Sequence, residues 1–205
     1  MRTKNAMQLK ARINARAKNV GISAQSMMQN YLFERFLERL SKSKWRSNVV
    51  IKGGMLISSL VGVASRTTMD LDTTITGFTL THESAEKVFR EVAAVSVDDD
   101  WSFEFDRTED IREADDYPGI RIHLKAIYPP MSVPLMIDVT TGDSIIPGPI
   151  AYNYPLLFDE GKRSADVLPA RDGARREARD RRCARRDQHP PARLLRHTPA
   201  MANQG

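Results

Sequence analysis

The feature that most constrains the fold is a pair of glycines between an apolar run and an apolar, helix-like segment. The run 49–51 leads into Lys52, Gly53 and Gly54, and the apolar segment 55–63 follows. The short run is typical of a buried strand, and the longer segment is typical of a helix. Because glycine has no side chain, backbone N–H groups at such a turn can approach an anion closely. The sequence therefore predicts a strand–turn–helix unit whose turn binds phosphate groups.

Three aspartates follow on predicted strands. Asp70 and Asp72 stand two positions apart on the predicted strand 69–75, so both side chains point to one face. Asp138 lies among apolar residues of the predicted strand 133–140, where an unpaired carboxylate is costly. Carboxylate oxygens suit Mg²⁺, and shared ions would offset that cost. We therefore expect the three aspartates to bind two metal ions, roughly 3.5–4 Å apart, for nucleotidyl transfer from an NTP.

Each signal is weak alone, and their order along the chain makes them specific. Paired acids and paired glycines are each common in loops. A strand, a glycine pair, a helix, paired acids on a strand and a third acid on a later strand, in this order, are typical of nucleotidyl transfer. Arg66 either contacts a phosphate or pairs with an aspartate, and Lys52 is expected to be exposed or structural. His82 and His123 are expected at the surface. The sequence has no His/Cys spacing for zinc and no Walker-type phosphate loop.

Hydrophobic periodicity predicts two helices near the N-terminus and a third after the paired acids. Apolar stripes run through residues 7–20 and from the cap Ser23 to about residue 40. Gly21 separates these two helices, and Thr81 caps the third. The basic face of the first helix is expected to be solvated, with RNA contact as the lesser alternative.

Alternating and apolar runs predict a mixed sheet. The expected strands are 47–52, 69–75, 101–106, 120–126 and 133–140. The acid clusters 98–100 and 109–116 are expected to be solvated loops, and prolines 147, 149 and 155 to mark a further loop. This order of elements predicts an α+β fold, with a mixed sheet flanked by helices.

Composition favours one cytoplasmic domain followed by an unusual basic tail. The 205 residues have an ordinary globular composition, with no apolar run long enough for a membrane span and no secretory signal. Cys183 is the single cysteine, which excludes an internal disulfide. Residues 163–205 carry 11 Arg and 5 acids, whereas residues 1–162 carry 20 bases and 21 acids. The net charge of +5 therefore resides in the tail, and the body gives no compositional argument for nucleic-acid binding.

At these motifs the chain resembles the nucleotidyltransferases of the AbiEii/AbiGii toxin family. The matching segments are the helix 32–41, the turn 50–56, the segment 66–72 and the strand 136–139, all within residues 20–162. The resemblance implies a polymerase-β-like nucleotidyltransferase fold, Mg²⁺-dependent use of an NTP, and a toxin role in a toxin–antitoxin or phage-defence system with a cognate antitoxin. It also implies an RNA acceptor such as a tRNA 3′ end. The family's glycine turn and paired acids map onto Gly53, Gly54, Asp70 and Asp72.

Residues 163–205 depart from the family, which continues with a helical C-terminal half. We expect a nucleotidyltransferase domain at 1–162, with N-terminal helices in 7–44 and a catalytic sheet in 47–158, followed by an Arg/Ala/Pro-rich tail. The tail is either disordered or out of frame. Residues 170–177 can be encoded so that a shift of one base reads L-E-T-V-L-A-E-K, which resembles the family's segment here. We favour the frameshift, and expect a chain that keeps its metal site but is destabilised and weak or inactive.

Two rival functions stay open at this point. An antitoxin-type nucleotidyltransferase of the same fold would modify a partner protein, and the acceptor found in a transfer assay separates it from the toxin. A non-catalytic RNA-binding protein would act through the arginine-rich tail. Deletion of residues 163–205 would abolish RNA binding by such a protein and would spare nucleotide binding by an enzyme.

Overall fold

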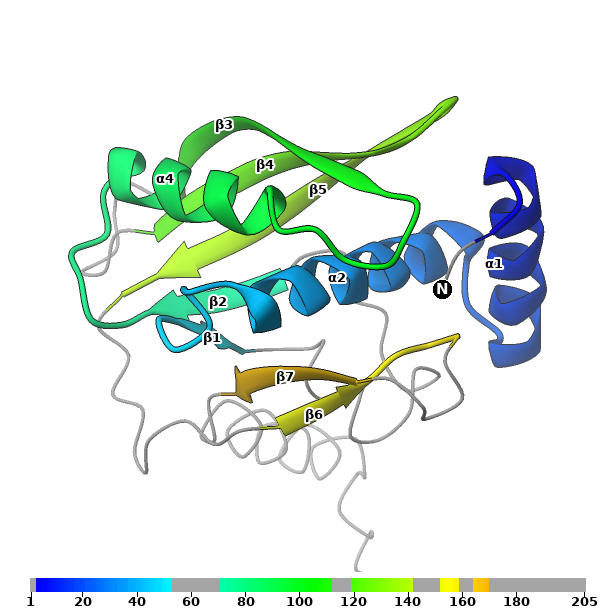
Figure 1. The fold of residues 1–205 in the computed structure, drawn as a ribbon, viewed down its shortest axis with the longest axis horizontal. Helices are drawn as coiled ribbons and strands as arrows, with labels where there is room; N and C mark the ends of the chain where they lie inside the picture. Colours follow the sequence, from blue (N-terminus) through cyan, green and yellow to red (C-terminus); the bar gives the residue numbers. More distant parts are fainter. Residues whose placement is uncertain (1–2, 53–70, 112–118, 142–151, 159–163, 170–205) are drawn as a thin grey trace, which may run out of the picture.

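The chain folds into a mixed sheet with helices packed against it (Figure 1). The computed structural model describes residues 3–52, 71–111, 119–141, 152–158 and 164–169. The helices are α1 (Ala6–Val20), α2 (Ala24–Lys42) and α4 (His82–Ala93). The strands are β1 (Val49–Ile51), β2 (Leu71–Ile75), β3 (Ser102–Ile111), β4 (Gly119–Tyr128), β5 (Met131–Thr140), β6 (Tyr152–Pro155) and β7 (Ser164–Pro169). The α+β class is therefore as predicted.

The seven strands form one sheet in the order β3-β4-β5-β2-β1-β7-β6. Strands β3, β4 and β5 pair antiparallel, as do β1 with β2 and β6 with β7. The pairs β2–β5 and β1–β7 are parallel. Strands β2 and β5 are distant in sequence but neighbours in the sheet. Their pairing therefore places Asp72 beside Asp138.

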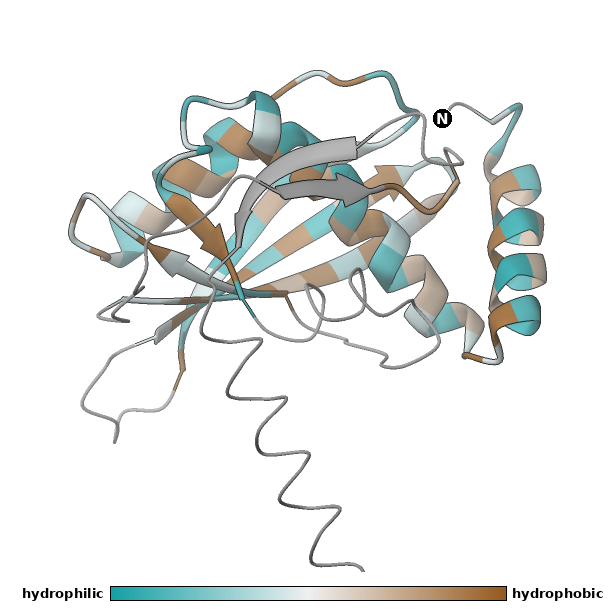
Figure 2. Cartoon of the chain, turned by 90° about the horizontal axis from the view of Figure 1, so that it is seen from below, coloured by the Kyte–Doolittle hydropathy of each residue, from teal (hydrophilic) through white to brown (hydrophobic). Residues whose placement is uncertain are grey.

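Helices α2 and α4 lie on the same side of the sheet and bury its apolar face (Figure 1). The strands alternate in hydropathy along their length (Figure 2). On β4, Ile122 and Leu124 are buried in the core, whereas Arg121 and His123, which alternate with them, are only partly buried. Phe36 of α2 stacks on Phe89 of α4, with ring centroids 5.8 Å apart. One face of the sheet is therefore apolar and covered, and the other face carries the polar side chains.

The helix ends lie where local sequence chemistry predicts them. Gly21 ends α1 in the left-handed region with φ of 76°, which suits glycine. The side chain of Ser23 accepts a hydrogen bond from the backbone N–H of Ser26 at the start of α2. Thr81 and Ser84 form a reciprocal capping box at the start of α4. Gly21 satisfies carbonyl acceptors at the end of α1, and the Ser23 and Thr81 side chains satisfy N–H donors at the starts of α2 and α4.

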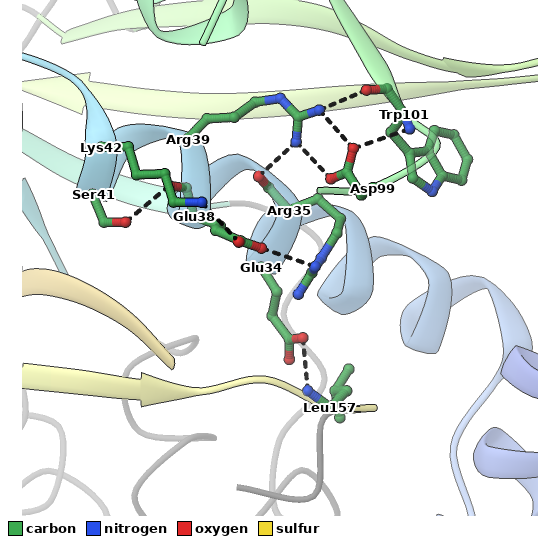
Figure 3. Close-up of polar contacts among 9 residues, drawn as sticks. All are labelled: Glu34, Arg35, Glu38, Arg39, Ser41, Lys42, Asp99, Trp101 and Leu157. Carbon is green, nitrogen blue, oxygen red and sulfur yellow. Dashed lines mark hydrogen bonds and ion pairs between the residues drawn. The ribbon is translucent and has the colours of Figure 1, made fainter. Parts of the chain in front are cut away.

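A buried charged cluster ties α2 to the segment before β3 (Figure 3). The guanidinium of Arg39 donates to both carboxylate oxygens of Asp99 at 2.8 Å, and also to the carbonyl oxygens of Arg35 and Trp101. The side chains of Arg39 and Asp99 are only 3% and 1% exposed. The prediction that the acid cluster 98–100 is solvated is therefore wrong for Asp99, because Arg39 compensates its burial.

Three further boundaries differ from the predictions. Strand β3 continues through Ile111, so the first residues of the predicted loop 109–116 are in a strand that β4 pairs with. Pro155 lies in β6 rather than in a loop. Residues 164–169 form β7, beside β1, within the segment that was predicted to be an irregular tail. All three depend on pairing with distant strands, which local sequence does not reveal.

Other predicted elements fall outside the described ranges. The helix predicted at 55–63 and the tail beyond residue 169 are among them. None of the helices that the structure describes is long and apolar enough to cross a membrane.

Candidate active site

A row of charged side chains crosses the polar face of the sheet. Asp72 on β2 lies opposite Asp138 on β5, and Asp138 lies opposite Arg121 on β4. Arg121 in turn lies opposite Glu109 on β3. Residues that oppose one another in a sheet point to the same face. Ile137, which precedes Asp138, is fully buried on the helix-covered face. The sheet register thus gathers charges from four strands into one line.

Asp72 and Asp138 are the predicted pair that the structure brings together. Adjacent strands lie about 4.8 Å apart, so two carboxylates in register can share one cation. The side chain of Asp138 is 18% exposed, and Asp72 is half-buried. Oxygen ligands in a partly shielded position fit Mg²⁺. Within the described ranges no cluster of three metal-ligating side chains occurs, and the predicted partner Asp70 lies outside those ranges.

Arg121 is the residue of this site that sequence reasoning missed. Its Nε donates to Oδ1 of Asp138 at 2.7 Å, and its Nη2 donates to Oδ2 at 2.8 Å. Such a two-pronged, charge-assisted pair fixes both the charge and the plane of the carboxylate. The Arg121 side chain is 31% exposed, so the pair is open to solvent on one side. The alternation of β4 placed Arg121 on the polar face, but only the β4–β5 register reveals its partner.

Lys52 extends the row beyond Asp72. Its backbone N–H donates to the carbonyl oxygen of Asp72 at 2.8 Å, which continues the pairing of β1 with β2. Its Nζ donates to Oγ1 of Thr140 at 2.7 Å, and that hydroxyl lies 3.0 Å from Oγ1 of Thr74. Lys52 therefore has the structural contacts expected of it, and it also adds a fixed positive charge beside the carboxylates.

The remaining predicted residues divide into two groups. The residues whose placement stays a prediction, because they lie outside the described ranges, are Gly53, Gly54, Arg66 and Asp70. The two histidines are described. His82 is 49% exposed, as predicted, whereas His123 is only 15% exposed and its Nε2 lies 2.8 Å from Oε2 of Glu109. His123 is therefore partly shielded on the open face of the sheet, beside the charged row, rather than fully exposed.

Comparisons with known proteins place this site in a family. The family described as "Nucleotidyl transferase AbiEii toxin, Type IV TA system" matches residues 35–172. No curated protein matches the chain. Among solved structures, the crystal structure of JHP933 from Helicobacter pylori is similar, with 14% sequence identity and a TM-score of 0.37. That similarity covers 60% of this chain and 46% of the other, so this chain spans less than half the length of that protein.

The family match extends from α2 through β7 and contains the charged row. Asp72, Arg121 and Asp138 all lie inside it. A nucleotidyltransferase family together with the α+β architecture agrees with the polymerase-β-like fold class that the sequence predicts. The chain belongs to the AbiEii family of nucleotidyltransferase toxins, which the family description assigns to type IV toxin–antitoxin systems.

Proposed function

We propose that this chain is a cytoplasmic, Mg²⁺-dependent nucleotidyltransferase toxin that transfers a nucleotide from an NTP to an RNA acceptor such as a tRNA 3′ end. A cognate antitoxin would oppose it. The observation that carries the proposal is the direct register of Asp72 with Asp138 inside the family match. A pair of carboxylates on adjacent strands is the arrangement that phosphoryl-transfer chemistry needs for its metal ligands.

The proposed reaction replaces one bond at phosphorus with another. The oxygen of the acceptor hydroxyl bonds to the α-phosphorus of the NTP, the bond to the bridging oxygen breaks, and pyrophosphate leaves. Bound Mg²⁺ supplies charge neutralisation and a more acidic hydroxyl. Asp70, Asp72 and Asp138 would hold the ions, and Asp138 would also orient the acceptor hydroxyl and accept its proton. Backbone N–H groups of Gly53 and Gly54 would cradle the triphosphate.

Two cationic side chains complete this proposal. Arg121 would act as a positioning residue, because it holds both oxygens of Asp138 in one plane. Arg66 would contact a phosphate of the NTP. Residues that orient metal ligands in this way commonly change metal affinity or activity by about 10- to 100-fold when they are replaced.

A transfer assay tests the proposal. The full chain would be incubated with an RNA acceptor, Mg²⁺ and each labelled NTP in turn, beside Asp72→Asn and Asp138→Asn. We expect labelled RNA from the unchanged chain alone, and loss of the label when the metal is chelated. Labelling by the Asp138→Asn variant at the unchanged rate would contradict the proposed site. A label found on protein rather than RNA would favour the rival enzyme, which modifies a partner protein.

We also propose that the sequence beyond β7 is out of frame and that this weakens the enzyme. The family match ends at residue 172, close to the end of β7 at Pro169. The gene sequence tests this proposal. If the proposal is correct, the codons for residues 168–196, read in a frame shifted by one base, encode a helix that resembles the family's. A chain translated in that frame is expected to transfer nucleotides at least about tenfold faster, a change of about 1.4 kcal/mol in barrier. Equal rates for both chains would contradict the proposed weakening.

A further inference from the structure

The N-terminal helix carries a charge pattern that the candidate site does not use. Residues 1–33 contain six Lys or Arg side chains and no Asp or Glu, whereas residues 34–162 contain 14 basic and 21 acidic side chains. The positive charge of the folded body is therefore concentrated in its first segment. A charge segregation of this size on one element is an electrostatic footprint for a polyanion.

The basic side chains of α1 lie on its outer surface. Leu9, Ile13 and Ala17 form the buried stripe that packs on α2. The exposed basic residues around that stripe are Lys10, Arg12, Arg16 and Lys18, and Lys4 just before the helix is also exposed. In Figure 2 the inner side of α1 is hydrophobic and its outer side is largely hydrophilic. The cations therefore project from an element at the end of the molecule.

The other exposed residues of α1 favour nucleic acid over protein as the occupant. They include neutral hydrogen-bonding side chains, namely those of Gln8, Asn14 and Asn19, and the exposed Asn5 caps the start of the helix. Lys, Arg, Asn and Gln are the residue types that contact phosphate and sugar groups. Protein interfaces, by contrast, have an aromatic or apolar centre. Met7 is the one large apolar side chain that is exposed on α1, at 80%.

The position of α1 sets the length of RNA that can reach it. Thr3, just before α1, donates its N–H to Asp100 and its hydroxyl lies 3.4 Å from that of Tyr128 at the end of β4. Asp138 lies seven residues beyond Met131, the first residue of β5, which is about 23 Å at 3.3 Å per residue. In Figure 1 the arrowhead of β5, which marks its C-terminal end, likewise lies at the opposite end of the molecule from α1. A single strand that starts at the site therefore has to extend over about 23 Å, a span of several nucleotides, to reach α1.

We propose that α1 is a docking surface for the sugar-phosphate backbone of the RNA acceptor, some distance from its reacting 3′ end. This inference rests on the proposed function for the identity of the RNA, but RNA binding is measured without any transfer. The contact is electrostatic and independent of base sequence. It therefore strengthens binding most for acceptors that are long enough to reach α1 from the site.

The test compares RNA binding by the full chain and by a variant with Lys10→Gln, Arg12→Gln, Arg16→Gln and Lys18→Gln. The probe is a labelled, unstructured single-stranded RNA of about 30 nucleotides, titrated at several salt concentrations by fluorescence anisotropy. We expect Kd to rise at least about tenfold and the slope of log affinity against log salt to fall by up to about 3, at roughly 0.7 per lost contact. An RNA of about three nucleotides should lose less affinity than the long RNA, because it offers fewer phosphates to the cations of α1.

Matched variants separate docking from net charge and from misfolding. The charge control replaces four exposed cations elsewhere by Gln, namely Lys44, Arg90, Arg107 and Lys125, each of which already lies beside an acid. It should change Kd by less than about threefold. Arg12→Lys with Arg16→Lys keeps the charge and should keep the affinity. Equal loss of affinity in the charge control and in the α1 variant would overturn the proposal.

Two further outcomes are decisive. If the α1 variant binds the long RNA as tightly as the unchanged chain does, the helix is not an RNA surface. If replacing the arginines of 171–196 by Gln alone removes all RNA binding, the tail is the docking element and α1 is not. RNA binding that depends on α1, without nucleotide transfer by either this chain or the chain translated in the shifted frame, would sustain this inference while refuting the proposed function. The reverse result would refute this inference alone.

Discussion

Two Arg–Asp pairs in this molecule have nearly the same hydrogen-bond geometry and opposite surroundings. Arg39 and Asp99 pair through two hydrogen bonds of 2.8 Å, and Arg121 and Asp138 pair through bonds of 2.7 and 2.8 Å. The first pair is at most 3% exposed, and the second is 31% and 18% exposed. The Arg39 guanidinium also holds two backbone carbonyl oxygens. Geometry alone therefore does not distinguish a structural pair from a site pair.

The surroundings do distinguish them. The Arg39 guanidinium is held by the Asp99 carboxylate and two carbonyl oxygens, so removing Asp99 would leave a buried, unpaired charge. Arg121 lies between Asp138 and the opposing Glu109, on the polar face of the sheet. A partly exposed guanidinium can be rehydrated or can share its carboxylate with a cation at modest cost. We therefore expect the first pair to act on stability and the second on chemistry.

The largest expected effect on stability comes from Asp99→Ala. The change leaves the Arg39 charge buried without its carboxylate, which costs about 3–5 kcal/mol of unfolding free energy. Urea denaturation followed by circular dichroism measures the loss. Asp98→Ala provides a matched control, because Asp98 is exposed on the same segment. A loss below about 1 kcal/mol for Asp99→Ala would place this pair with ordinary surface pairs.

A smaller effect is expected at alkaline pH from Tyr31, which lies in the same buried region. Burial raises the pKa of the Tyr31 hydroxyl to about 12, against the partial opposing effect of Arg35. The unfolded chain then loses this proton first, near pH 10, so stability falls as the pH rises from there. We expect a loss of about 1.3 kcal/mol between about pH 9 and about pH 11 that Tyr31→Phe removes. Identical pH dependence in Tyr31→Phe and the unchanged chain would contradict this assignment.

Arg121→Gln, in contrast to Asp99→Ala, is expected to affect activity more than stability. Its unfolding free energy should fall by at most about 1 kcal/mol, because the pair is partly exposed. Nucleotide transfer should fall by about 10- to 100-fold, because Asp138 loses the side chain that orients it. Arg121→Lys keeps the charge but not the two-pronged geometry, and should recover only part of the rate. A stability loss as large as that of Asp99→Ala would make Arg121 a structural residue.

The smallest effect is expected at a fully surface pair. Arg90 donates to Glu86 at 2.7 Å on α4, with side chains 54% and 45% exposed. Glu86→Ala should change the unfolding free energy by no more than about 0.5 kcal/mol. Thermal unfolding in low and high salt measures it, and a larger change would show that exposure is a poor guide to the worth of a pair in this protein.

Much of the fold followed from local sequence patterns. The stripes and caps of α1, α2 and α4 were predicted because periodicity and capping are properties of short segments. The strand β7 was missed because its partner β1 lies more than a hundred residues away. The same reason explains why Asp99 was wrongly predicted to be solvated. Its burial depends on pairing with Arg39, which is distant in the sequence.

The candidate site divides in the same way. Asp72 and Asp138 were predicted from residue type and strand position, and the register of β2 with β5 places them side by side. Arg121 was not predicted, since an arginine that alternates with apolar residues is ordinary on any half-buried strand. Its role becomes visible only when β4 and β5 are set in register. The chemistry available to a site residue can thus be predicted from its residue type. The residues that it contacts can be identified only when the pairing of the strands is known.

One measurement tests the central claim that Asp138 and Asp72 form the nucleotide site. Mn²⁺-dependent binding of an NTP by the full chain would be followed by electron paramagnetic resonance, in parallel with Asp138→Asn and with Asp98→Asn as an exposed control. The arrangement predicts that Asp138→Asn weakens Mn²⁺–NTP binding at least about tenfold with little change in melting temperature, and that Asp98→Asn binds as the unchanged chain does. Equal Mn²⁺–NTP affinity in all three chains would contradict it.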